Sequence, residues 1–181
     1  MRPVAEKKRR RNEIAAYHEA GHAVMAVLTR TPLRDTTILS SRLGASSGAT
    51  RLVETRDGRT KFAAKMKLGT RGHRLMLRRA CFDIAGEIAQ RRFAPGSWRT
   101  MHSRSDLANI SRLLDSLGLS EERLNTLAKA IVSRAYSLIQ ANWSCVAAVA
   151  SELLQRKTLT GAQVRRIVAS NRNPAREMPQ T

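Results

Sequence analysis

The stretch Ile14-Ala-Ala-Tyr-His-Glu-Ala-Gly-His-Ala-Val24 lies in a segment that we predict to be a helix over residues 13–28. It contains the motif H-E-x-x-H, with histidines at positions 18 and 22. Residues four apart in a helix lie on one face, one turn apart, so both imidazoles can reach a single Zn²⁺ ion. The flanking alanines and valine predict that this helix is buried. The stretch therefore predicts a metal site on a core helix.

Glu19 directly follows the first of these histidines. A carboxylate at that position can take a proton from a zinc-bound water and deliver it to a leaving amine. The alternative interpretation is two surface histidines on a helix with an unrelated glutamate. The apolar residues on both sides of the motif argue against that alternative, because they bury the helix.

A catalytic zinc ion also needs a third protein ligand and an open fourth position. The candidates for this ligand are His73, Asp83, Glu87, His102 and Asp106. Asp106 lies in the first turn of a helix predicted over residues 105–117, where a carboxylate is held ionised. An ordinary helix-terminal carboxylate would look the same. Spacing alone does not rank Asp106 above Glu87 or His102.

The whole chain is predicted to be mainly α, with a small two-stranded β element. Two short stretches with β-branched residues, at 36–40 and 49–54, are separated by a segment rich in glycine and serine, which indicates two strands. The predicted later helices span 69–93, 105–117, 120–140, 142–154 and 160–168. The organisation that follows is a flexible basic arm over 1–11, one domain over 12–170 and a flexible tail over 171–181.

The composition limits the class of protein. The 181 residues include 33 Lys+Arg against 14 Asp+Glu, a net charge of +19, so anionic partners are expected. Hydrophobic residues make up 42% of the chain, which argues against a protein that is disordered throughout. Aromatic residues make up only 4%, which argues against a surface that binds nucleic acid by stacking on bases. No apolar run approaches the roughly 18–20 residues that cross a bilayer, so we expect a cytoplasmic protein. Cys81 and Cys145 have no CxxC spacing, and we expect two buried, reduced thiols.

The order of motifs resembles the peptidase domain of the FtsH-like ATP-dependent zinc metalloproteases. The resemblance starts at residues 14–24 and continues through Thr37-Ile-Leu-Ser-Ser-Arg-Leu-Gly-Ala, Ala85-Gly-Glu-Ile-Ala-Gln90, Ser103-Arg-Ser-Asp-Leu107 and Leu159-Thr-Gly-Ala-Gln-Val164. It spans about residues 12–170. It implies a helical zincin-type domain with His18, His22 and Asp106 as zinc ligands and Glu19 as general base.

The function implied by this resemblance is a zinc metalloendopeptidase that hydrolyses unfolded or flexible polypeptides. We expect the substrate to lie extended along the edge formed by Ala49, Thr50, Arg51, Leu52 and Val53, as an added strand. Unlike most members of the family, the chain has no transmembrane helix and no G-x-x-x-x-G-K-[ST] loop for ATP. A separate AAA+ ATPase, or a homo-oligomer, is the expected partner.

One further departure from the family pattern is Gln90, which stands where the family favours glutamate. This change affects either contacts close to the metal ligands or helix packing; the alternative is an exposed helix residue.

Two alternative functions remain at this point. The first is a non-catalytic basic module on a zincin scaffold that binds nucleic acid or an acidic protein. Lys and Arg are in excess in residues 1–11 and 51–92, but no helix-turn-helix or zinc-finger pattern favours this function, and a binding module has no need of Glu19. The second is another kind of small H-E-x-x-H protease with Glu87 or His102 as the third ligand.

Overall fold

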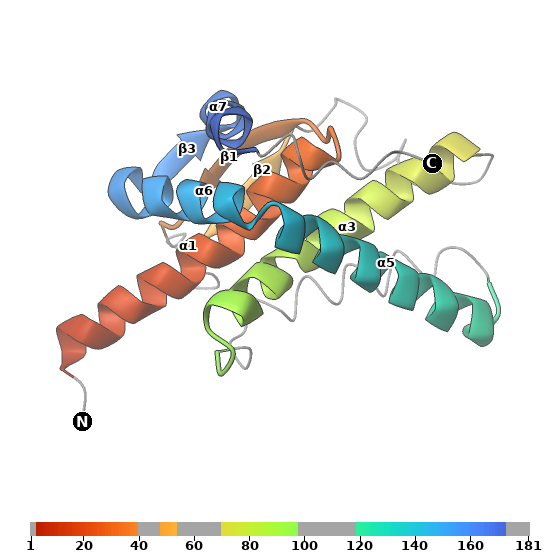
Figure 1. The fold of residues 1–181 in the computed structure, drawn as a ribbon, viewed down its shortest axis with the longest axis horizontal. Coiled ribbons are helices and arrows are strands. Elements are labelled where there is room, and N and C mark those ends of the chain that lie inside the picture. The colour runs from red at the N-terminus through yellow and green to blue at the C-terminus, as the bar shows by residue number, and fades with distance from the viewer. Residues whose placement is uncertain (1–2, 40–47, 54–69, 98–118, 173–181) are drawn as a thin grey trace.

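A computed structural model describes residues 3–39, 48–53, 70–97 and 119–172, with the backbone alone for residues 70–74. The elements in chain order are α1 (Val4–Leu28), β1 (Leu33–Thr37), β2 (Ala49–Leu52), α3 (Thr70–Phe93), α5 (Glu121–Ala141), α6 (Trp143–Arg156), β3 (Thr158–Thr160) and α7 (Gly161–Asn171) (Figure 1). Helices account for most of these residues, so the predicted mainly α class is confirmed. The predicted helix over 105–117 lies outside the described residues.

Helix α1 forms the centre of the fold and packs against both α3 and α6 (Figure 1). Its approach to α3 depends on small residues. A Cβ atom on Gly21 would lie 2.5 Å from the carbonyl oxygen of Ala85 and 2.7 Å from the Cβ of Ala89. The two backbones are therefore close enough for short side chains of one helix to reach the backbone of the other.

Three aromatic rings join α1, α3 and α6 beside this crossing. Tyr17 stacks on Phe93 with 3.8 Å between ring centroids, and the ring of Trp143 lies 5.6 Å from that of Tyr17. Arg10 lies over the face of Phe93 and Arg92 over that of Trp143, so both rings also take part in cation–π contacts. Aromatic stacking thus fixes the part of α1 directly before the H-E-x-x-H motif.

The prediction of a flexible arm over residues 1–11 is wrong for residues 4–11, which are the first turns of α1. Lysine, arginine and glutamate are good helix formers, which explains why the basic run is helical. Glu13 also pairs with Arg9 and Arg10 at helical spacing. The basic residues are exposed, and they are continuous with the helix that carries the histidines.

The β element has three antiparallel strands rather than the predicted two, in the order β2-β1-β3. Strand β3 is only three residues long and lies between two helices, so its alternation is too short to be recognised in the sequence. Strand β1 covers Leu33–Thr37 rather than 36–40. Arg30, with a φ of 54°, turns the chain after α1, and Leu33 is already buried in the sheet.

The last two helices begin at the capping residues that the sequence predicts, but only one of these residues caps its helix through its side chain. Thr160 caps α7 through a capping box with Gln163, as the sequence predicts for a helix start. Asn142 stands at the N-cap of α6, but its side-chain amide donates to the carbonyl of Leu138 in the preceding helix. No helix in the described ranges is long and apolar enough to cross a membrane.

Both cysteines are buried free thiols, as predicted. Burial raises the pKa of Cys81 and of Cys145, because the charged thiolate loses its solvation inside the protein.

Candidate metal centre

His18 and His22 face each other where α1 meets α3. Their Nε2 atoms are 3.1 Å apart, and each residue is only 5% exposed. Two nitrogens bound to one tetrahedral zinc ion at about 2.05 Å stand about 3.3 Å apart. The separation of the two rings is therefore close to the one that a shared zinc ion requires, as the spacing of the motif predicts.

Each ring is held in place through its Nδ1 atom. The Nδ1 of His22 lies 2.7 Å from the carbonyl oxygen of Phe82, which only accepts, so this Nδ1 carries the proton. The Nδ1 of His18 lies 3.0 Å from Oε1 of Gln90. The Nε2 of Gln90 donates to the carbonyl oxygen of Ser97 at 2.9 Å, which fixes the orientation of the amide. The Nδ1 of His18 therefore donates to Gln90.

With the proton on Nδ1, the neutral form of each ring has its lone pair on Nε2, and the two Nε2 atoms are directed toward one region. Lone pairs 3.1 Å apart repel each other unless a positive charge, from a proton or a metal ion, lies with them. A neutral imidazole whose Nδ1–H is bound by an oxygen is the usual state of a metal-ligating histidine. The donor set and its tautomers therefore fit a zinc ion.

Gly86 on α3 leaves the space that the rings occupy. A Cβ atom at this position would lie 2.3 Å from Nε2 of His22 and 2.9 Å from Cε1 of His18. Real Cβ atoms do not approach other atoms so closely, so the position requires glycine as long as the rings stay in place. Gly86 belongs to the segment Ala85–Gln90, and nothing in the sequence of that segment indicates that this glycine lies against the two histidines.

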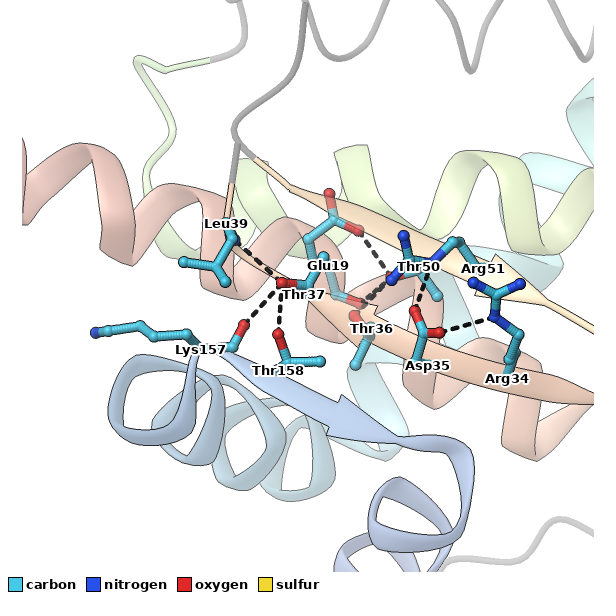
Figure 2. A network of polar contacts seen from close by, with 10 residues as sticks. All are labelled: Glu19, Arg34, Asp35, Thr36, Thr37, Leu39, Thr50, Arg51, Lys157 and Thr158. Carbon is cyan, nitrogen blue, oxygen red and sulfur yellow. Dashed lines mark hydrogen bonds and ion pairs between the residues drawn. The ribbon is translucent and has the colours of Figure 1, made fainter. Parts of the chain in front are cut away.

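Glu19 lies on the side of α1 that faces the sheet (Figure 2). Its Oε2 accepts a hydrogen bond of 2.7 Å from the hydroxyl of Thr50 on β2. Its Cγ and Oε1 pack against Gly48, where a Cβ atom would lie 2.8 Å from each of them. Glu19 is 5% exposed as a whole residue, and its side chain lies between β2 and the helix that carries the histidines.

The structure describes two of the candidate third ligands, Asp83 and Glu87. Asp83 pairs with Arg79 at 2.9 Å, and Glu87 pairs with Arg91. The Oε2 atom of Glu87 is buried and accepts no hydrogen bond from the described residues. Within the described ranges, no three His, Cys, Asp or Glu side chains form a metal-binding group, so neither carboxylate joins the histidine pair.

The other candidate ligands are not placed. Asp106, which the resemblance implies as the third ligand, and His102 lie outside the described residues, as does the side chain of His73. The assignment of Asp106 therefore stays a prediction.

The interpretation of Gln90 as an exposed helix residue is wrong. Gln90 is 3% exposed, and its side chain bridges His18 and Ser97. The departure from the family pattern therefore lies in direct contact with a predicted metal ligand. A glutamine accepts the Nδ1–H hydrogen bond as a neutral group, where a glutamate would accept it as an anion.

The predicted substrate-binding segment coincides with an edge strand. Strand β2 pairs with β1 on one side and has no other partner among the described strands. Beside it, Arg34 and Arg51 both bond to Asp35 (Figure 2). Burial alone would raise the pKa of Asp35, but these hydrogen bonds and positive charges hold it below its usual value.

No family model and no curated protein matches this chain. The functional interpretation therefore depends on the motifs and on the geometry of the two histidines, Glu19 and their neighbours.

Proposed function

We propose that the chain is a zinc metalloendopeptidase of the FtsH-like kind, acting on unfolded or flexible polypeptides. The observation that carries the proposal is the pair of buried imidazoles with Nε2 atoms 3.1 Å apart and both Nδ1 atoms bonded to oxygen acceptors. A helix whose histidines served only packing would have no need of two anchored rings directed at one point. Asp106 is proposed as the third ligand.

In this proposal each group of the chain has one task. A zinc ion held by His18 and His22 would polarise the peptide carbonyl and lower the pKa of a bound water. Glu19 takes the proton from the attacking water and delivers it to the leaving amine. Strand β2 holds the polypeptide backbone by adding it to the sheet as a further strand. A separate AAA+ ATPase, or an assembly of several copies of this chain, would supply folded substrates in unfolded form.

The test is Glu19→Gln, which keeps the size of the side chain but removes the base. We expect unchanged zinc content and fold, with cleavage of casein lowered by about 10²- to 10⁴-fold. Glu13→Gln is the matched control, since Glu13 lies on the same helix and pairs with the exposed side chains of Arg9 and Arg10. Equal cleavage by wild type and Glu19→Gln would reject Glu19 as the base, and a wild type that binds zinc without cleaving would reject the enzyme.

A second candidate, a module that binds nucleic acid, is favoured by one observation. The first turns of α1 carry a run of exposed lysines and arginines at residues 7–11. This function would be supported if the protein binds duplex DNA tightly and its affinity falls steeply as the salt concentration rises. The same measurement on Glu19→Gln separates the two candidates, because the substitution leaves the basic run intact.

A further inference from the structure

A chain of two hydroxyl groups connects Glu19 to the middle of the sheet (Figure 2). We infer that Thr50 is a positioning residue for Glu19 and that Thr36 orients the hydroxyl of Thr50. This inference rests on the proposed function, in which Glu19 is the base. It gives Thr50 a second task beyond the backbone contact with substrate that its place on β2 predicts.

The direction of the hydrogen bonds follows from the groups involved. The Oγ1 of Thr50 lies 2.7 Å from Oε2 of Glu19, 3.2 Å from the carbonyl oxygen of Glu19 and 2.7 Å from Oγ1 of Thr36. The carboxylate and the carbonyl only accept, so the single proton of Thr50 is donated to Glu19. Thr50 must then accept from Thr36. The chain therefore runs from Thr36 through Thr50 to Glu19.

The two threonines are themselves firmly placed. They are paired directly opposite each other in the register of β1 and β2, and Thr36 on the central strand is fully buried. On its other side the carboxylate of Glu19 packs against Gly48, which lies just before β2. Glu19 thus packs against Gly48 and is hydrogen-bonded to Thr50, and both contacts hold its carboxylate beside β2.

The arrangement joins substrate binding to the position of the base. Thr50 belongs to the edge strand that is proposed to hold the polypeptide, and the same residue orients Glu19. Losing the hydroxyl should therefore lower kcat while leaving KM nearly unchanged, because the backbone of β2 stays in place. A hydrogen bond to a charged group is typically worth about 10- to 100-fold, so we expect a fall in kcat of that size.

The experiment compares Thr50→Val, which keeps the shape but removes the hydroxyl, with Thr50→Ser, which restores the hydroxyl. Thr158→Val is the matched control, because the hydroxyl of Thr158 bonds to that of Thr37 at 2.8 Å in the other half of the sheet. We expect a reduced kcat for Thr50→Val alone. Thr50→Ser and Thr158→Val should each keep a kcat within a few-fold of wild type, and all three variants should bind as much zinc as the wild type. A Thr50→Val enzyme with wild-type kcat, or a loss shared by Thr158→Val, overturns the inference and leaves the proposed function intact.

If the wild type cleaves nothing, a crystal structure of Thr50→Val still tests the positioning role of Thr50 separately from the proposed peptidase function. That result would reject the proposed function, and the position of Glu19 would then decide the inference. A carboxylate that turns away from residue 50 in Thr50→Val, but not in Thr158→Val, supports the positioning role. An unmoved carboxylate refutes it.

Discussion

Replacing Gly86 by alanine tests the metal centre with a single methyl group. The new Cβ would lie 2.3 Å from Nε2 of His22, 2.7 Å from its Cδ2 and 2.9 Å from Cε1 of His18. Non-bonded heavy atoms normally stand about 3.5 Å apart, so the ring of His22 must move by roughly 1 Å. Metal–ligand distances tolerate only about 0.2 Å, so a displacement of this size removes the ligand.

The expected effect on stability follows from two opposing terms. Alanine in place of glycine inside a helix favours folding by about 1 kcal/mol, and overpacking of a filled site costs about 1–3 kcal/mol. The metal-free protein should therefore lose at most about 2 kcal/mol. Zinc at 100 times its Kd stabilises the wild type by about 2.7 kcal/mol, and this gain should vanish in Gly86→Ala. Thermal unfolding with and without zinc measures the difference.

Two other glycines provide matched controls. A Cβ atom on Gly21 meets Ala85 and Ala89 rather than the rings, so Gly21→Ala should unfold at a lower temperature yet keep the zinc-dependent rise. Gly96 has nothing within 4 Å of its position, so Gly96→Ala should change neither quantity. If Gly86→Ala gains as much stability from zinc as the wild type does, the histidine pair does not bind the metal and the reasoning fails.

Three other expectations concern the third ligand, nucleotide and the thiols. Elemental analysis should find zinc lost in Asp106→Ala and retained in Glu87→Ala; the opposite pattern would reassign the ligand. The purified protein should cleave casein equally with and without ATP, and ATP-stimulated cleavage of a tightly folded protein without a partner would contradict this. Because burial raises the pKa of Cys81 and Cys145 above the ordinary value of 9.0, native protein should react slowly with thiol reagents at pH 7. The stability that these thiols contribute is complete below pH 9.0 and is lost as pH rises through their folded pKa, which unfolding measured from pH 8 to 11 would detect.

Features of the fold with a local signal were predicted well from the sequence. The helix expected over 69–93 is Thr70–Phe93, and the one expected from residue 120 is Glu121–Ala141. Apolar spacing and N-terminal capping residues supply these signals within a single segment. Strand β3 had no such signal, because three residues become a strand only through pairing with β1, more than 120 positions earlier.

The candidate site also has residues that a local sequence signal reveals and residues that it does not. His18, Glu19 and His22 are neighbours in one motif, so they could be found from spacing. The groups that hold them are 31 to 72 positions away and chemically ordinary: the carbonyl of Phe82, the amide of Gln90 and the hydroxyl of Thr50. A hydroxyl on a strand contacts a helix only in one register of the sheet, and spacing in the sequence does not determine that register.

The unbroken course of α1 has a mechanical consequence. At about 1.5 Å per residue, its 25 residues form a rod of about 37 Å, with no break between the exposed basic turns and the histidines. Arg11, seven residues before His18, lies close to the same face, so the angle between the basic turns and the imidazoles is fixed. A pull or twist applied to the charged end would therefore reach the histidines as a movement of the whole rod, with no loop between them to absorb it.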